Sequence, residues 1–223
     1  MTPEPAGSAP GLLPVRVRSN GRLDEGLHLV ALDRPFDFVP GQHVGLALDP
    51  AVEPRLYSIG SGPCDDAMEI LFDVHPEGAL TPRLAEVRPG DAVWTTRPAG
   101  TFACGPGPGL WIAGGTGIAP FVSMRRAGLA AGKTLIHGAR SAAAFHGAAE
   151  FAAEAGLVYR RCSSRADGPD IERGRIPGLI ARLDPLPDGP CLLCGPPEMV
   201  VAAREALFAR GLAAGRVRAE IYF

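Results

Sequence analysis

The stretch Trp111-Ile112-Ala113-Gly114-Gly115-Thr116-Gly117-Ile118-Ala119-Pro120 decides how the second half of this chain is interpreted. The apolar run at 110–113 is typical of a buried strand, and a helix pattern follows over 120–130. A glycine turn between a strand and a helix lets the backbone approach a pyrophosphate, which the free N–H groups of the helix attract. Pro120 stands where the usual fingerprint has its third glycine, and the first helical turn accepts it because no N–H is needed there. These residues alone leave nucleotide binding and an ordinary strand–helix turn equally open.

Strand and helix patterns alternate on both sides of this turn in the second half of the chain. The predicted strands span 110–113, 134–137, 157–162, 191–194 and 217–222, and the predicted helices span 120–130, 142–155, 177–183 and 198–210. Such alternation predicts a parallel sheet covered by helices on both faces.

The first half has a different rhythm, with short strand patterns separated by Gly, Pro, Asn and Asp. Six strands are predicted at 13–18, 27–32, 43–48, 55–60, 68–75 and 92–96, with one helical patch at 82–86. This spacing predicts an antiparallel barrel or sandwich. We therefore expect a β + α/β chain with a loose tail at 1–10, a six-stranded antiparallel β-barrel domain over 11–104 and a Rossmann-like parallel α/β domain over 105–223.

Composition restricts the classes of function. The chain has 223 residues and a net charge of −2, so no bulk positive field favours nucleic acid or anionic lipid. Residues 98–124 carry no charge, but glycines and prolines break this segment too often for a membrane span. No charged-then-apolar leader opens the chain, and we expect a cytoplasmic protein. The five cysteines are scattered and the histidines lack ligand spacing, so we expect neither a disulfide framework nor a metal.

Two further stretches carry polar residues that could bind a ligand or take part in a reaction. Strand alternation in Arg55-Leu56-Tyr57-Ser58 sends Arg55 and Tyr57 to one face and Ser58 to the other, which suits a phosphorylated aromatic ligand. Cys194-Gly195-Pro196-Pro197 ends a predicted strand at the edge where parallel sheets bind ligands. A half-exposed strand and an inert buried thiol are the simpler interpretations of each stretch by itself.

In this order, the three motifs R-x-Y-S at 55–58, G-G-x-G-x-x-P at 114–120 and C-G-x-P at 194–197 resemble the ferredoxin–NADP reductase superfamily, over residues 13–223. The bacterial ferredoxin/flavodoxin–NADP reductase branch is the most similar. It shares His137-Gly138-Ala139-Arg140 in part, Gly174-Arg175-Ile176-Pro177 and the ending Ala219-Glu220-x-Tyr222-aromatic. The family signature supplies Pro120, which accounts for the departure from the usual fingerprint.

The resemblance implies a flavin site and a role for each matching residue. Arg55 would pair with a flavin phosphate, Tyr57 would stack on the isoalloxazine ring, and the Ser58 hydroxyl would reach its redox-active nitrogen. Leu56 completes this segment, and Gly78, Ala79, Leu80 and Thr81 form a second one whose N–H groups and hydroxyl would hold phosphates. Phe223 would stack on the adenine of FAD. Relatives often end in tryptophan, and phenylalanine offers the adenine of FAD a smaller ring to stack on. FMN therefore stays open as the flavin.

The resemblance also implies a nicotinamide site beside the flavin. Thr116 and Cys194 would touch the nicotinamide, Tyr222 would lie near the crevice, and Glu220 would either assist proton movement or serve the last strand structurally. Turn residues of this site would be Gly115, Gly117, Pro120, Gly195 and Pro196. Arg140, Ser164, Arg165 and Arg175 would surround a 2′-phosphate, which favours NADP(H) over NAD(H).

The implied activity is hydride exchange between NADP(H) and FAD, with single electrons passed to or from ferredoxin or flavodoxin. Such acidic carriers need a basic docking face, for which the candidates are Arg22, Arg83, Arg125, Arg126 and Arg218. We expect a monomer. A reductase component for an oxygenase or a free-flavin reductase is the first alternative, although no iron–sulfur cysteine set is present. A non-catalytic flavin- or nucleotide-binding regulatory module is the second.

Overall fold

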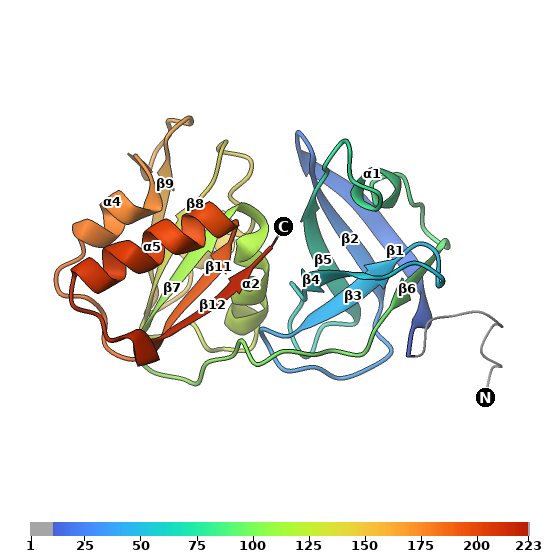
Figure 1. Cartoon of the computed structure of the whole chain (residues 1–223), viewed down its shortest axis with the longest axis horizontal. Helices are drawn as coiled ribbons and strands as arrows, with labels where there is room; N and C mark the ends of the chain where they lie inside the picture. The colour runs from blue at the N-terminus through green and yellow to red at the C-terminus, as the bar shows by residue number, and fades with distance from the viewer. Residues whose placement is uncertain (1–10, 223) are drawn as a thin grey trace.

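The computed structural model describes residues 11–222, which form two units side by side (Figure 1). Strands β1–β6 make an antiparallel sheet, called here the antiparallel unit, and β7–β12 make a parallel sheet with helices, the parallel unit. The last strand, β12, runs back toward the place where the two units meet (Figure 1). The predicted fold class is confirmed.

The antiparallel unit is a closed barrel. Its elements are β1 (Leu13–Asp24), β2 (Leu27–Asp33), β3 (His43–Ala47), β4 (Arg55–Ser58), β5 (Ala67–Asp73), α1 (Thr81–Leu84) and β6 (Ala92–Thr95). The strand order is β4-β3-β6-β1-β2-β5, and a bridge between Ile59 and Ile70 joins the two outer edges. Alternate apolar side chains point inward and form one core that includes Val30, Met68 and Phe72.

Strand β1 runs further than the sequence predicts. Asn20-Gly21 indicates a break, yet the strand continues to Asp24 because irregularities between Val17 and Ser19 and between Arg22 and Asp24 keep it paired with β2. The Asn20 side chain does not form a turn; its amide donates to the carbonyls of Leu84, Ala85 and Val87. It therefore ties the strand to α1 and the residues that follow it.

The parallel unit alternates strands and helices. Its strands are β7 (Gly109–Gly114), β8 (Lys133–Gly138), β9 (Val158–Ser163), β10 (Ile171–Arg173), β11 (Cys191–Gly195) and β12 (Val217–Ile221). The helices are η1 (Gly115–Ile118), α2 (Ala119–Arg126), α3 (Ala148–Ala152), α4 (Ile176–Ala181), α5 (Pro197–Ala209) and η2 (Ala214–Arg216). The strand order is β10-β9-β8-β7-β11-β12. Separate apolar clusters lie on the two faces, one with α2 and α3 and one with α4 and α5, so both faces are covered as expected.

One local prediction in this unit was wrong, and one strand was missed. The alanine-rich run at 142–155 is helical only in α3, because Ser141 holds the start of the run in a turn by accepting the N–H of Ala144. Gly147 then adopts a left-handed φ of 73° immediately before the helix begins. Strand β10 was not predicted, since three residues between polar loops carry too little pattern.

The only lysine of the chain contacts the segment that connects the two units. Lys133 is buried, and its ammonium donates to the carbonyls of Gly105 and Gly107 in the connection. The ammonium also lies 6.0 Å from the centre of the Trp111 ring. Carbonyl acceptors therefore offset the burial of this charge, and they fix the connection against the start of β8.

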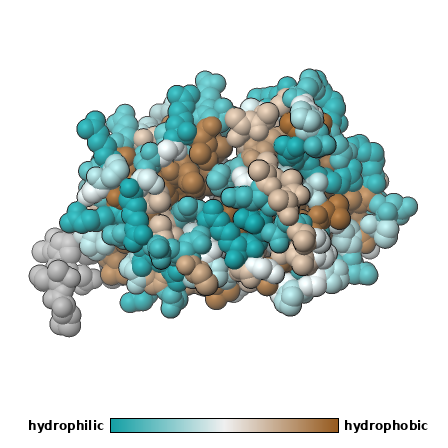
Figure 2. Space-filling model, turned by 180° about the vertical axis from the view of Figure 1, so that it is seen from behind, coloured by the Kyte–Doolittle hydropathy of each residue, from teal (hydrophilic) through white to brown (hydrophobic). Residues whose placement is uncertain are grey.

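The outer surface shows no single apolar face in the view from behind (Figure 2), where hydrophilic and hydrophobic residues are mixed. None of the helices among residues 11–222 is long and apolar enough to cross a membrane.

Candidate functional site

The four residues predicted to be catalytic come together where the two units meet. The Cys194 thiol at the end of β11 lies 2.8 Å from the Tyr222 hydroxyl, just after β12. Ser58 at the end of β4 and Glu220 in β12 stand beside them. Three of the four, Ser58, Glu220 and Tyr222, border a hollow of about 180 Å³, called here the junction cleft. Its lining residues are His43, Leu56, Tyr57, Ser58, Glu220, Ile221 and Tyr222.

Ser58 is an unsatisfied polar residue in this cleft. Its hydroxyl is buried and has no hydrogen-bond partner of good geometry among the described residues. It nevertheless lies close enough to Cys194 and Tyr222 to lower the pKa of both groups. Buried polar atoms are nearly always paired, so an unpaired hydroxyl that also borders a cleft is a candidate for contact with a ligand.

The thiol and the phenols of the site are neutral. Burial raises the pKa of the Cys194 thiol above its ordinary value, and it raises that of the Tyr222 phenol in the same way. Cys194 is therefore a protonated thiol at neutral pH and not a thiolate nucleophile. Burial also raises the pKa of Tyr57 to about 12, and its ring meets Phe72 edge-on at 6.5 Å.

His43 is a site residue that the sequence did not reveal. It faces Ser58 directly in the β3–β4 register, and its Nδ1 lies 3.6 Å from a carboxylate oxygen of Glu220. Burial raises the pKa of Glu220, while the nearby His43 and Ser58 act in the opposite direction. Strand alternation assigns a face but not a register, so the pairing of His43 with Ser58 could not be foreseen.

The glycine turn packs tightly against β11. Gly115 has a left-handed φ of 55°, and a Cβ added at Gly117 would stand 2.1 Å from the carbonyl oxygen of Cys194. Glycine at 117 is therefore required for the turn to contact the end of β11. Pro120 lies in the first turn of α2 as predicted, and η1 leads into that helix without interruption. Thr116 stands within η1, and Pro196 caps α5 immediately after Gly195.

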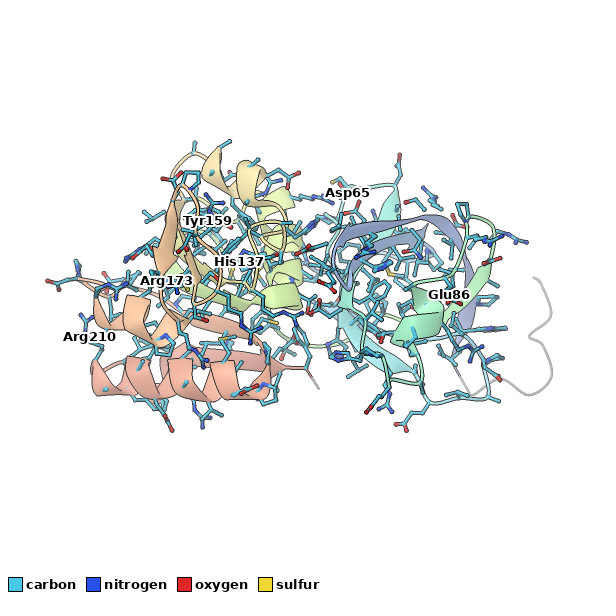
Figure 3. The ribbon with its side chains drawn as sticks, turned by 90° about the horizontal axis from the view of Figure 1, so that it is seen from above. Asp65, Glu86, His137, Tyr159, Arg173 and Arg210 are labelled. Carbon is cyan, nitrogen blue, oxygen red and sulfur yellow. The ribbon has the colours of Figure 1, made fainter. Side chains whose placement is uncertain are left out.

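A buried histidine, His137, contacts the backbone of the glycine turn. The Nδ1 of His137 lies 3.2 Å from the Tyr159 hydroxyl, and the two residues stand close together in Figure 3. Burial lowers the pKa of His137 to about 3, although a contact with the backbone of Gly115 acts against this shift. The ring is therefore neutral and bridges β8, β9 and the glycine turn.

The second predicted flavin segment lies beside α1. Gly78 and Ala79 are exposed, and Leu80 packs partly on the barrel core. The Thr81 hydroxyl is buried and accepts the N–H of His75 at 2.9 Å, which leaves its own proton to donate. Arg55 and Leu56 are exposed on β4.

The residues predicted around a 2′-phosphate follow three neighbouring strands. Arg140 follows β8, Ser164 and Arg165 follow β9, and Arg175 follows β10, so all stand at the carboxyl edge of the sheet. The Ser163 hydroxyl fixes the turn after β9 by accepting the N–H groups of residues 165 and 166. Phe223, predicted to stack on adenine, lies outside the described residues.

Two of the arginines suggested for carrier docking already form ion pairs with carboxylates of this chain. Arg126 donates to Asp65 at 2.8 Å and to Glu69 at 2.6 Å, which joins α2 to the antiparallel unit. Arg125 pairs with Glu150 and Glu154 within the parallel unit. The other three suggested residues, Arg22, Arg83 and Arg218, are exposed.

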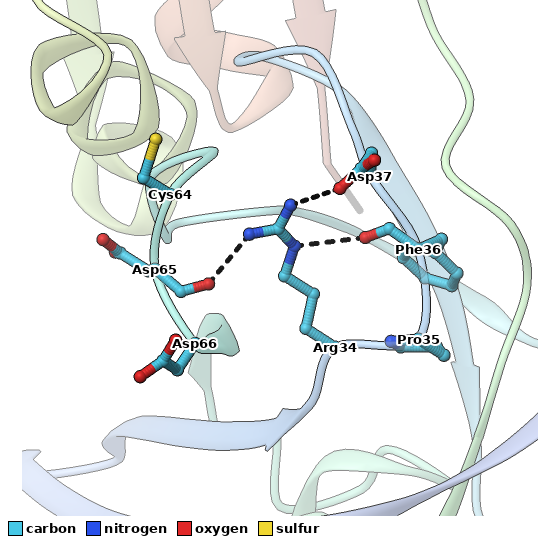
Figure 4. A pocket seen from close by; sticks show the side chains of 7 residues that line it. All are labelled: Arg34, Pro35, Phe36, Asp37, Cys64, Asp65 and Asp66. Atoms are coloured by element: carbon cyan, nitrogen blue, oxygen red, sulfur yellow. Dashed lines mark hydrogen bonds and ion pairs between the residues drawn. The ribbon is translucent and has the colours of Figure 1, made fainter.

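A second hollow, about 380 Å³, lies away from the junction cleft, and its polar side chains do not converge on one point (Figure 4). Arg34 uses its donors on the carbonyls of Phe36 and Asp65 and on the Asp37 carboxylate. The carboxylates around it point in different directions (Figure 4). Among residues 11–222, no group of three or more His, Cys, Asp or Glu side chains is arranged to hold a metal ion.

Comparison with known proteins places this geometry in context. Residues 111–205 match the family model of the oxidoreductase NAD-binding domain. The chain is 33% identical over 211 residues to the reductase subunit of an aromatic O-demethylase from Amycolatopsis, covering 86% of this chain and 63% of that protein. A propane 2-monooxygenase reductase component from Mycolicibacterium goodii is 32% identical over 189 residues, with 54% of it covered. The chain thus spans about half to two thirds of these two relatives.

A ferredoxin NADP+ reductase from Neisseria gonorrhoeae, solved with bound FAD and NADP, shares the fold with a TM-score of 0.85. It is 21% identical to this chain and covers 96% of it, and all of that protein is covered. A flavodoxin/ferredoxin–NADP reductase from Shigella flexneri is 32% identical over 188 residues. Because that likeness covers 73% of this chain and 76% of the relative, it extends over both units. The protein therefore belongs to the ferredoxin–NADP reductase superfamily, as its motifs led us to expect.

Proposed function

We propose that this chain is a flavin-dependent NADPH oxidoreductase with FAD in the antiparallel unit and NADP(H) along the parallel unit. The observation that carries the proposal is the unpaired buried hydroxyl of Ser58, which lies in the junction cleft between motifs from both units. FAD, when bound, would supply the chemistry that takes up a hydride and releases electrons one at a time. The proposed division assigns residues 11–104 to the flavin domain and 105–223 to the NADP domain, with residues 1–10 as a tail.

The residues around the cleft fit a flat, polar-edged ring. Tyr57 lines the cleft and offers its aromatic ring for stacking. The Ser58 hydroxyl can donate a hydrogen bond to, or accept one from, the edge of the bound flavin ring. The exposed Arg55 would bind a flavin phosphate, and the backbone of 78–80 with the free Thr81 proton would hold the rest. The proposal therefore gives the Ser58 hydroxyl the partner that it lacks.

The parallel unit would hold the coenzyme along the carboxyl edge of its sheet. Backbone N–H groups of the glycine turn at 115–117 would approach its pyrophosphate, and Thr116 and Cys194 would touch the nicotinamide. Exposed arginines after β8, β9 and β10 concentrate positive charge at this edge, which favours a coenzyme with a 2′-phosphate, hence NADP(H).

Catalysis would consist mainly of positioning. The neutral Cys194 thiol and Tyr222 phenol would hold the nicotinamide against the flavin without adding charge, and this close approach supplies most of the rate. Glu220, beside Ser58 and His43, would hold or move a proton at the edge of the cleft. Its raised pKa suits that role.

The purified protein tests the proposal through its visible spectrum after incubation with FAD. We expect a bound flavin whose visible absorbance is lost within seconds when one equivalent of NADPH is added without oxygen. Equal loss with NADH would remove the 2′-phosphate assignment and keep the oxidoreductase. Failure to retain FAD would contradict the proposal as a whole.

The electron acceptor is proposed as ferredoxin or flavodoxin, reached by a cytoplasmic monomer. Support comes from the Shigella relative, a flavodoxin/ferredoxin–NADP reductase. A reductase component for an oxygenase is the second candidate, since the Mycolicibacterium relative is a propane 2-monooxygenase reductase component and the Amycolatopsis relative is also a reductase subunit, of an aromatic O-demethylase. Reduction of a purified flavodoxin by NADPH, compared with reduction of a plant-type ferredoxin, separates acceptors, and light scattering measures the oligomeric state.

A further inference from the structure

Arg140 differs from the other two arginines of the proposed coenzyme site because acidic groups of the antiparallel unit face it. Its guanidinium lies 3.3 Å from the carboxylate of Asp73 at the end of β5. Asp24, at the end of β1, also lies within electrostatic reach and accepts a hydrogen bond from the hydroxyl of Ser141. The loop after β8 is thus held to the antiparallel unit by two carboxylates.

Arg165 and Arg175 have no such partners. Both side chains are exposed and form no ion pair with any of the residues from 11 to 222. They follow β9 and β10, one and two strands beyond the strand that leads to Arg140. The positive charge available to an incoming dianion is therefore concentrated away from Asp73 and Asp24.

Asp73 is held in place by the barrel and does not move freely toward solvent. It pairs in register with Leu27, its neighbour Val74 is bonded to the backbone of Gly26, and its side chain is only 27% exposed. The Arg140 side chain by contrast is 68% exposed, so an incoming phosphate can reach the arginine more readily than Asp73. A phosphate that approached Arg140 would have to share it with a fixed negative charge.

We propose that Asp73 is a specificity-determining residue: it commits Arg140 to the antiparallel unit, leaves the 2′-phosphate to Arg165 and Arg175, and limits the preference for NADPH over NADH. This inference rests on the proposed function, because it assumes that the coenzyme lies along the carboxyl edge of the parallel sheet. A unit charge about 9 Å from a phosphate dianion changes its binding by roughly fivefold in water.

The test uses the FAD-loaded protein and two nucleotides, 2′-phospho-AMP and AMP, with binding measured by calorimetry. In Asp73→Asn we expect 2′-phospho-AMP to bind about fivefold more tightly, while AMP changes by less than about twofold. Asp33→Asn is the matched control, because Asp33 pairs with Arg18 at the opposite end of β2 and should alter neither affinity.

Arginine variants keep the proposal testable if Asp73→Asn folds poorly. Arg140→Ala should weaken 2′-phospho-AMP by less than about threefold, whereas Arg165→Ala should weaken it by at least about tenfold. Unchanged or weaker 2′-phospho-AMP binding in Asp73→Asn, or a large loss in Arg140→Ala, would overturn the role of Asp73. If the wild-type protein retains no FAD and binds neither nucleotide, the proposed function itself fails, which is a distinguishable result.

Discussion

At the scale of single residues, its place at the junction cleft distinguishes Ser58 from other buried polar groups without a partner in the described part of the chain, such as the Trp111 indole N–H and the Ser123 hydroxyl, which belong to the core of the parallel unit. Ser58 has a buried hydroxyl with no partner of good geometry among the described residues, and it stands at a cleft. Lys133, although charged and buried, is satisfied by backbone carbonyls and has a structural role. The R-x-Y-S motif located Ser58, but its unsatisfied state depends on how the two units meet, which no local pattern encodes.

His137 should make the protein sensitive to mild acid. Its pKa falls from an ordinary 6.5 to about 3 on folding, so protonation favours the unfolded chain. The stability that depends on the neutral ring is complete above pH 6.5 and is lost as the pH falls toward about 3. The slope from this one group approaches about 1.4 kcal/mol per pH unit. Urea unfolding at several pH values should therefore show a shallower acid limb in His137→Gln than in the wild type.

The difference between the two slopes is the informative quantity, since His137→Gln will also lower stability at neutral pH by disturbing the core. His146, which is partly buried with a lowered pKa, remains in both proteins, so its titration contributes to both slopes. Parallel acid limbs in the two proteins would show that His137 is not held neutral.

At the scale of elements, the glycine turn and α2 depend on how closely η1 lies against β11. A Cβ at Gly117 would stand 2.1 Å from the carbonyl oxygen of Cys194 and 2.5 Å from its carbon, so backbone must move. This turn could be predicted from the sequence because glycine, proline and an apolar strand pattern occur together. The sequence pattern misplaced the helix at 142–155, because the tertiary contact between Ser141 and Asp24 overrides the helical propensity of alanine.

Gly117→Ala should lower the free energy of unfolding by about 2 to 3 kcal/mol and slow hydride transfer, because the displaced backbone carries Cys194. Gly215→Ala is a matched control, since Gly215 also lies in a 3-10 helix, η2, with nothing near its Cβ position. We expect that control to change stability by less than about 1 kcal/mol. Equal effects of the two substitutions in urea unfolding would contradict the close packing of the turn.

At the scale of the whole molecule, the site exists only while the two units keep their relative position. Arg126 of α2 bridges to Asp65 and Glu69 of the antiparallel unit, and its side chain is 23% exposed. The two-unit fold could be predicted from the change of rhythm near residue 105 together with the family resemblance. These ion pairs could not be predicted, because each partner alone is indistinguishable from a solvated surface charge.

Arg126→Ala should destabilise the FAD-loaded protein by about 2 to 3 kcal/mol, since it leaves two partly buried carboxylates beside each other without a cation. Arg18→Ala breaks the Arg18–Asp33 pair, whose side chains are each 45% exposed, and should change stability by less than about 1 kcal/mol. Both values come from urea unfolding followed by flavin fluorescence. Similar losses in the two variants would mean that Arg126 does not hold the units together.

The most direct test of the account is the rate at which NADPH bleaches the bound flavin in Ser58→Ala, measured by anaerobic rapid mixing at saturating coenzyme. Because Ser58 is the unpaired hydroxyl at the place where both units' motifs converge, we predict a fall of at least about tenfold in that rate while FAD stays bound. An unchanged rate in a variant that still carries its flavin would contradict the assignment of the junction cleft as the place of hydride transfer.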